Sequence, residues 1–221
     1  GGLHGVGISV VNALSSSLQV TVFKNSKKYS QKYLKGKVKS KIKIEKCKKN
    51  EKGTEIIFIP DETIFETIKF SPKKLYDFIK MKAVLVSGTS IDFKIDKELI
   101  VDSTPSYEKF YFKNGIADYL DIKNKNSAKL FDKQFSIVNK INDTEKCEIF
   151  ISFNQSEKSS LVSFCNTIET PDGGSHENGF KNGIIKAIKL YGQKNQVAKI
   201  SNININDLTD YSDIVISIFI N

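Results

Sequence analysis

The chain opens with GGLHGVGISVVNALS, in which four glycines among the first seven residues run directly into an apolar stretch. Glycine loses more backbone freedom on folding than any other residue, so this cluster indicates an unusual backbone conformation or a close approach to a ligand. Apolar residues then recur at helical spacing, at Val6, Val10, Ala13 and Leu14. The N-terminus of a helix attracts anions through its unpaired N–H groups. The pattern therefore predicts a phosphate site around Gly5 and Gly7.

The motif lacks residues that two common types of phosphate-binding loop require. A Walker A loop ends in Gly-Lys-Ser/Thr, and no lysine precedes Lys24. A Rossmann fingerprint needs a third glycine where Val10 stands. A glycine-rich turn that only links two elements stays open as the alternative. His4 has no nucleophile placed beside it in the sequence, so we expect it to face phosphate or to stabilise the loop. For His176, in GGSHENG, we expect a hydrogen-bonded loop residue.

Composition favours a protein of the cytoplasm. Of the 221 residues, 39% are hydrophobic, which supports a real core. No apolar run is long enough to span a membrane, and no signal peptide is visible. Cysteines occur only at Cys47, Cys147 and Cys165, without a CxxC pair. Their odd number and wide spacing predict reduced thiols and argue against disulfides or a zinc site.

The chain is basic, and all of its basic side chains are lysines. It has 34 Lys+Arg, none of them arginine, against 25 Asp+Glu, for a net charge of +9. A nucleic-acid surface is one interpretation, but arginine is the preferred residue for bidentate contacts with bases and phosphates. Codon bias in an AT-rich genome is the favoured explanation. A non-catalytic nucleic-acid-binding module, built on the lysine-rich hairpin from Lys24 to Lys49 with Tyr29 and Tyr33 for stacking, is the alternative.

Hydrophobic periodicity predicts an α+β protein with more strands than helices. In the first half we expect helices at 6–14, 71–88 and 114–122, with strands at 18–22, 29–34, 37–47, 53–61 and 90–96. A linker-like stretch at 123–129 places a domain boundary near residue 125. In the second half we expect strands at 135–141, 147–153, 160–166 and 213–221, a polar loop at 170–179 and a helix at 180–192 that ends at Gly192. The final apolar strand predicts that the chain is an internal piece of a longer protein.

The opening motif resembles the ATP lid of the B subunits of bacterial type IIA topoisomerases, the family to which the B subunits of gyrase and topoisomerase IV belong. These proteins are part of the wider GHKL group of ATPases with Hsp90, MutL and histidine kinases. The resemblance continues in Gly53-Thr54, in FKNGIADYL and in CNTIETPDGGSHENGFKNGIIKAIKLYG, which cover nearly the whole chain in the family's order. The second-half motifs disfavour MutL. Between the two paralogues, GIADYL and TPDGGSHENGF favour topoisomerase IV.

The resemblance implies a fold and a set of binding residues. Residues 1–124 would be the C-terminal part of a GHKL-type ATPase α/β sandwich, and residues 125–221 part of a transducer domain that resembles ribosomal protein S5. Thr54 would bind near the adenine of ATP. The lid would contact the ATP phosphates through backbone amides of Gly2, Leu3, His4, Gly5, Val6 and Gly7, with Ile8 beside them.

The resemblance also implies what this chain lacks. The family's general-base glutamate, magnesium-binding asparagine and adenine-reading aspartate would precede Gly1, and its phosphate-sensing lysine would follow Asn221. We therefore assign no catalytic and no metal-binding residue here, and we expect the chain alone to hydrolyse no ATP. The full-length protein would be an ATP- and Mg²⁺-dependent enzyme of DNA strand passage. Its expected partners are DNA, an A-type subunit in a heterotetramer and a second copy of the B-type subunit, which dimerises when ATP binds.

Overall fold

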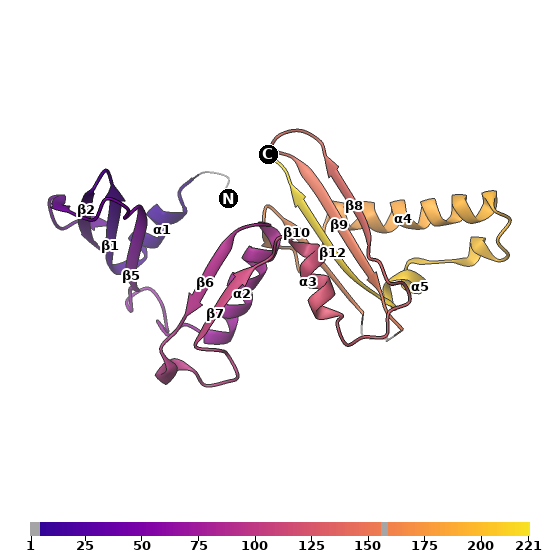
Figure 1. Cartoon of the computed structure of the whole chain (residues 1–221), viewed down its shortest axis with the longest axis horizontal. Coiled ribbons are helices and arrows are strands. Elements are labelled where there is room, and N and C mark those ends of the chain that lie inside the picture. Colours follow the sequence, from indigo (N-terminus) through magenta and orange to yellow (C-terminus); the bar gives the residue numbers. More distant parts are fainter. Residues whose placement is uncertain (1–4, 156–158) are drawn as a thin grey trace. The chain divides into compact units, whose positions relative to one another are not determined.

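The structure, a computed structural model, describes residues 5–155 and 159–221 and confirms the α+β class. The chain forms two compact units, Gly1–Ser71 and Pro72–Asn221, whose elements are labelled in Figure 1. The boundary expected near residue 125 falls inside the second unit. Compact packing and family domain limits are separate properties, so the division into 1–124 and 125–221 stays a prediction.

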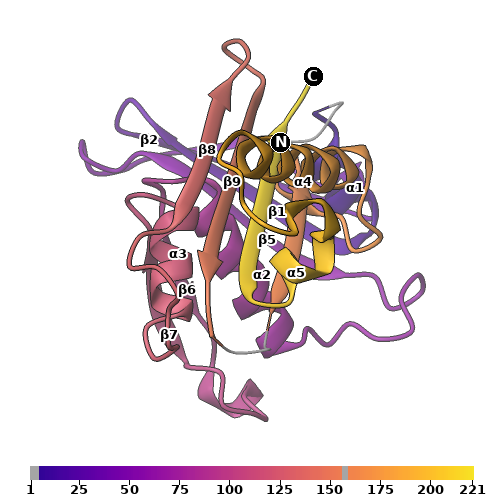
Figure 2. The ribbon, with the colours of Figure 1, turned by 90° about the vertical axis from the view of Figure 1, so that its right-hand side faces the viewer.

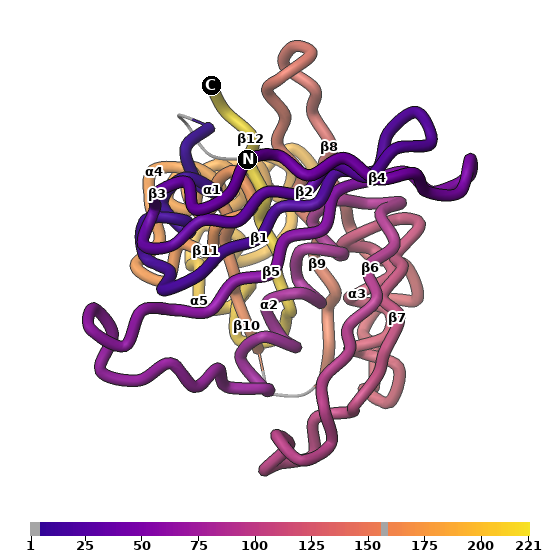
Figure 3. Tube along the Cα trace, turned by 90° about the vertical axis from the view of Figure 1, so that its left-hand side faces the viewer, coloured from indigo at the N-terminus to yellow at the C-terminus, as the bar shows by residue number. Residues whose placement is uncertain are grey.

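The first unit is an antiparallel sheet with one short helix. Helix α1 (Gly7–Ala13) leads through Leu14 into β1 (Ser15–Lys24). The other strands are β2 (Lys27–Leu34), β3 (Lys37–Val38), β4 (Lys43–Lys46) and β5 (Gly53–Pro60). Their order is β3-β2-β1-β5, with β4 also paired to β2, as the trace in Figure 3 shows.

Two sequence expectations in this unit were wrong in detail. The strand expected at 18–22 begins earlier, at Ser15, which is 1% exposed and whose hydroxyl donates to the Val11 carbonyl at 2.6 Å. The single strand expected at 37–47 is two short strands, because Ser40 interrupts it. The Ser40 hydroxyl accepts a hydrogen bond from the Lys32 N–H, and its carbonyl accepts one from Gln31.

The second unit has a mixed central sheet, a hairpin and helices on both sides. Its first half holds α2 (Pro72–Leu85), β6 (Ser90–Lys94), η1 (Lys97–Leu99), β7 (Tyr107–Tyr111) and α3 (Ile116–Lys123). Its second half holds β8 (Phe135–Lys140), β9 (Lys146–Phe153), β10 (Ser160–Cys165), β11 (Ile168–Glu169), α4 (Ser175–Lys194), η2 (Ile200–Asn202), α5 (Ile205–Thr209) and β12 (Ser212–Phe219). The sheet order is β11-β10-β12-β9-β8.

Strand β12 supplies both hydrophobic cores of this unit because its side chains alternate between the two faces. Ile214 and Ile216 pack with Phe180 of α4 and Leu208 of α5, the two helices seen over the sheet in Figure 2. Val215 points the other way and packs with residues of α2, α3, β6 and β7. A strand buried on both faces reads as a continuous apolar run, which is why β12 was recognisable in the sequence.

Three features of the second unit differ from expectation. Strand β7 was not anticipated. Helix α4 begins at Ser175, inside the segment expected to be a loop, and continues past Gly192 to Lys194. Gly192 is not a C-cap: a Cβ there would lie 2.1 Å from Cγ1 of Ile200, so the glycine permits close packing. Within the expected linker, Asn124 is 2% exposed and accepts a hydrogen bond from Asn154.

Candidate functional site

The glycine loop leads into an exposed helix start, as predicted. Gly5 has φ +63°, a left-handed conformation that favours glycine. Val6 is the N-cap residue, and no side chain caps the helix. Val6 and Ile8 are 51% and 45% exposed, and α1 has no buried residue. The first amides of α1 therefore have no side-chain acceptor at the cap. The predicted contact residues Gly2, Leu3 and His4 lie outside the described residues.

Gly5 and Gly7 are surrounded by open space on their side-chain side. A Cβ built on either residue meets no heavy atom within 4 Å. The positive φ explains why residue 5 is glycine. Gly7 stands inside the helix without a positive φ, so neither backbone conformation nor packing in the described structure requires glycine there. The space beside it suits a ligand that comes close to the backbone.

Thr54 shares a sheet face with the region that α1 covers. It is exposed, pairs with Val22 and follows Gly53, whose φ is +129°. Alternate residues of a strand point to the same face, so Thr54, Ile56 and Phe58 lie on one side. Phe58 and Val11 of α1 line the same pocket of about 270 Å³. Helix α1 therefore packs at the Phe58 end of this face.

Within the described residues, Thr54 lies at the far end of this face from helix α1. Thr54 is four residues from Phe58, which corresponds to about 13 Å along a strand. The pocket at Phe58 is lined by neither Thr54 nor residues 5–8. Between the two ends lie the half-buried Val20 and Val22, which pair with the exposed Ile56 and with Thr54. The face thus offers an apolar floor with a hydroxyl at one end.

Asp61 anchors the C-terminal end of α1, a role that the sequence reasoning missed. Its N–H donates to the Leu14 carbonyl at 3.0 Å, and Lys35 lies 3.0 Å from its carboxylate. Thr63 donates to the same carboxylate from its N–H at 3.0 Å and its hydroxyl at 2.8 Å. These hydrogen bonds, first those from Thr63 and then that from Lys35, hold the pKa of Asp61 below its usual value. The acidic residue directly after β5, at the end of the run IPD, was the available signal.

The TPDGGSHENG segment is fixed to the central sheet by a polar network. The buried Ser163 hydroxyl donates to Glu177 at 3.1 Å and lies 2.7 Å from the Thr170 hydroxyl. The Nε2 atom of His176 lies 3.2 Å from the Thr170 hydroxyl. The expected hydrogen bond of His176 is thus confirmed, although His176 is in the first turn of α4 and not in a loop.

Glu177 is the charged centre of this network. Lys181 donates to its carboxylate at 2.5 Å, and this hydrogen bond is the main reason that the pKa of Glu177 is lowered. A carboxylate in the first turn is also favoured by the helix dipole. A Cβ on Gly174 would lie 2.9 Å from the His176 ring, so this glycine allows the loop to pass close to the helix. The arrangement holds a loop in place and presents no exposed nucleophile.

No group of three or more His, Cys, Asp or Glu side chains in the described residues could hold a metal ion. No helix in residues 5–155 and 159–221 is long and apolar enough to cross a bilayer.

Comparison with known proteins places the whole chain within one family. The family model described as DNA gyrase B matches residues 115–221. The B subunit of DNA topoisomerase 4 from Rickettsia felis is 40% identical over 223 residues, a region that is 100% of this chain and 34% of that protein. The B subunit of DNA gyrase from Mycoplasma genitalium is 33% identical over 99% of this chain and 35% of its own length. The chain thus spans about a third of these relatives.

Solved structures agree with the sequence relatives. The 43K ATPase domain of Thermus thermophilus gyrase B, in complex with an aminocoumarin, has a TM-score of 0.76 and 26% identity over 99% of this chain and 59% of its own. The topoisomerase IV ATP-binding domain of Francisella tularensis has a TM-score of 0.73 and 31% identity over 100% of this chain and 59% of its own. The fold is that of a GHKL-type ATPase with a transducer. The chain belongs to the family of type IIA topoisomerase B subunits that gyrase and topoisomerase IV share.

Proposed function

We propose that this chain is the ATP-lid and transducer portion of the B subunit of a topoisomerase IV, which couples ATP binding and hydrolysis to DNA strand passage. The paralogue is favoured by relatives such as the topoisomerase 4 proteins of Rickettsia felis and Rickettsia conorii, each 40% identical. The partners of the full-length protein would be DNA, the A-type subunit and a second copy of the full-length protein itself. The cytoplasm, where bacterial DNA lies, is its proposed location.

The observation that carries the nucleotide site is Gly7. Nothing in the described structure demands glycine there, and the space beside it is open. Amides of Gly5, Val6, Gly7 and Ile8 are placed at the uncapped start of α1, and backbone N–H groups bind phosphate oxygens with about 1.5–3 kcal/mol each. Gly2, Leu3 and His4 would continue this cradle. The apolar floor that ends at Thr54 suits the purine ring, with the hydroxyl available for a hydrogen bond.

Magnesium would be held elsewhere in the full-length protein. The described residues contain no cluster of metal-ligating side chains, so they fit the phosphates of a nucleotide and not its cation. Bound Mg²⁺ would supply charge neutralisation at the phosphates. The role of the residues in hand is to bind and orient the nucleotide, and to exclude water as the lid closes.

The experiment compares two glycine substitutions in the full-length protein with its A-type subunit. Gly5→Val strains a left-handed backbone and crowds the phosphates, and it should abolish ATP-dependent relaxation of DNA. Gly7→Ala puts one methyl group into the open space. Because alanine favours a helix over glycine by about 1 kcal/mol, the protein should stay folded while the affinity for an ATP analogue falls at least about tenfold.

A control separates backbone strain from ligand contact. Gly88 has φ +77° and open space beside it, and it lies outside the proposed nucleotide site. Gly88→Ala should lower the melting temperature but leave analogue affinity unchanged. Wild-type relaxation and analogue binding in both Gly5→Val and Gly7→Ala would overturn the nucleotide site.

A further inference from the structure

The positive charge of the chain is concentrated in one segment of the first unit. Residues 24–52 contain thirteen lysines and two acids, Glu45 and Glu51, while the rest of the chain contains 21 lysines and 23 acids. The remainder is therefore slightly negative, and the segment accounts for the whole net charge of +9. Codon bias would enrich lysine throughout the chain. It does not explain why lysines outnumber acidic residues so strongly in this one segment.

Strand register places three of these lysines in a row. Lys24 of β1 is directly opposite Lys27 of β2, and Lys27 is directly opposite Lys46 of β4. All three are exposed, and in the described part of the chain none forms an ion pair. Like charges directly opposite each other destabilise a sheet. The row therefore costs folding stability unless an anion lies against it.

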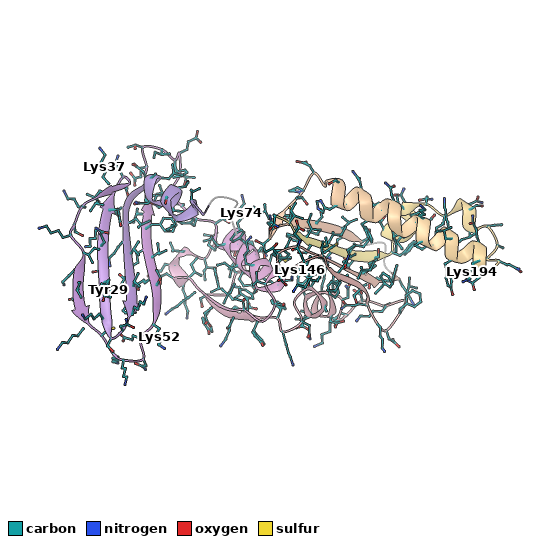
Figure 4. The ribbon with its side chains drawn as sticks, turned by 90° about the horizontal axis from the view of Figure 1, so that it is seen from above. Tyr29, Lys37, Lys52, Lys74, Lys146 and Lys194 are labelled. Atoms are coloured by element: carbon teal, nitrogen blue, oxygen red, sulfur yellow. The ribbon has the colours of Figure 1, made fainter. Side chains whose placement is uncertain are left out.

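The β4–β5 turn adds three more lysines at the same end of the sheet. The Cys47 N–H donates to the Ser26 carbonyl at 3.0 Å, which fixes the end of β4 against the β1–β2 turn. Gly53 then pairs with Phe23 at the end of β1. Figure 4 shows the extended side chain of Lys52 at this end and Lys37 at the other. We call the exposed set the lysine patch: Lys24, Lys27, Lys46, Lys48, Lys49 and Lys52.

We propose that the lysine patch binds the phosphate backbone of duplex DNA without reading its sequence. Lysines act as point charges, and the lack of arginine removes the side chain best suited to bidentate base contacts. The two tyrosines of this segment are poorly placed to stack on single-stranded bases. Tyr29 is half-buried in the sheet, and the Tyr33 hydroxyl donates a hydrogen bond to Gln31 at 2.7 Å. The patch borders the Thr54 end of the proposed nucleotide site, since Lys24 follows Val22, the partner of Thr54, by two residues, but it includes none of the residues assigned to that site. It rests on the proposed function only in that DNA is the substrate.

The test measures duplex binding by the full-length protein at several salt concentrations. The variant Lys27→Gln/Lys46→Gln/Lys49→Gln removes three charges from the patch. The control Lys94→Gln/Lys97→Gln/Lys109→Gln removes three exposed charges near the β6–β7 hairpin, where acids balance the lysines. Fluorescence anisotropy with a labelled duplex gives the slope of log K against log salt, which reports the number of phosphates neutralised.

The patch variant should bind DNA at least about tenfold more weakly, with a slope less steep by about 2.7 for three lost contacts. Its melting temperature should equal or exceed that of wild type, since repulsion in the row is relieved. The proposal would be overturned if the patch variant bound duplex DNA with the same affinity and the same salt slope as wild type and control. This would hold even if the patch variant no longer bound an acidic protein. Normal binding of an ATP analogue by the patch variant keeps this test independent of the nucleotide site.

Discussion

The ammonium group of Lys123, the last residue of α3, lies 2.6 Å from a carboxylate oxygen of Asp213, the second residue of β12. Asp213 is 2% exposed and also accepts hydrogen bonds from Ser160 and Asn154. Burial alone would raise the pKa of Asp213, but the hydrogen bonds from Lys123 and Ser160 outweigh it and hold the pKa low. The ion pair thus ties the end of α3 to the central strand of the five-stranded sheet of the second unit.

Asp213→Ala should lower the free energy of unfolding by about 3 kcal/mol, because its donors lose a buried charged partner. A carboxylate whose folded pKa is depressed stabilises the fold above its unfolded pKa, near 3.9, and loses that contribution as pH falls through the folded pKa. The gap between wild type and variant in urea unfolding should therefore narrow below about pH 4. A gap that stays constant down to pH 2 would contradict the ion-pair account.

Tyr76 of α2 should ionise at a higher pH than a free tyrosine. Its hydroxyl donates to Glu108 at 2.5 Å, and burial together with this carboxylate raises its pKa to about 12. A tyrosine in the unfolded chain ionises near pH 10. The contribution of the protonated Tyr76 to stability is therefore fully present below pH 10 and is lost as pH rises towards 12. Tyr76→Phe should remove this alkaline loss and cost about 1.5–3 kcal/mol at pH 7. The absorbance of tyrosinate during an alkaline titration checks the raised pKa of Tyr76 and the alkaline loss that depends on it.

Two glycines of α4 should respond in opposite ways to alanine. At Gly192 a Cβ would lie 2.1 Å from Cγ1 and 2.9 Å from Cβ of Ile200, so Gly192→Ala should displace η2 and lower the melting temperature. At Gly183 a Cβ meets nothing within 4 Å, and Gly183→Ala should stabilise the helix by about 1 kcal/mol. Thermal unfolding of the two variants tests this prediction. Equal shifts in their melting temperatures would show that α4 and η2 do not pack this closely.

The 221-residue chain alone should release no phosphate from ATP. By the resemblance to its family, the glutamate that activates water would lie outside this chain, and without a base the water would have no proton acceptor. A phosphate-release assay with the full-length protein as the positive control tests this. Turnover by the chain alone, unchanged by Gly5→Val, would place the chemistry elsewhere.

The sequence was most informative where one local rule dominates. The period-2 alternation at 18–22 predicted β1, and the apolar runs at 53–61 and 213–221 predicted β5 and β12. The glycine loop before a helical stripe predicted the start of α1. Strand β7 was missed because YEKFY is short and its two adjacent charged residues, Glu108 and Lys109, interrupt the alternation of apolar and polar side chains. The true start of α4 was missed because GGSHENG has the composition of a loop.

The sequence by itself determined the α+β class, most of the elements and the glycine-rich start of α1, because hydrophobic periodicity and glycine placement act over a few residues. Only the tertiary structure decided what depends on contacts distant in the chain. The position of Gly192 against Ile200, the burial of Asp213 beside Lys123, and the row of Lys24, Lys27 and Lys46 are all of this kind. Strand register and packing bring these residues together across separations that no local pattern encodes.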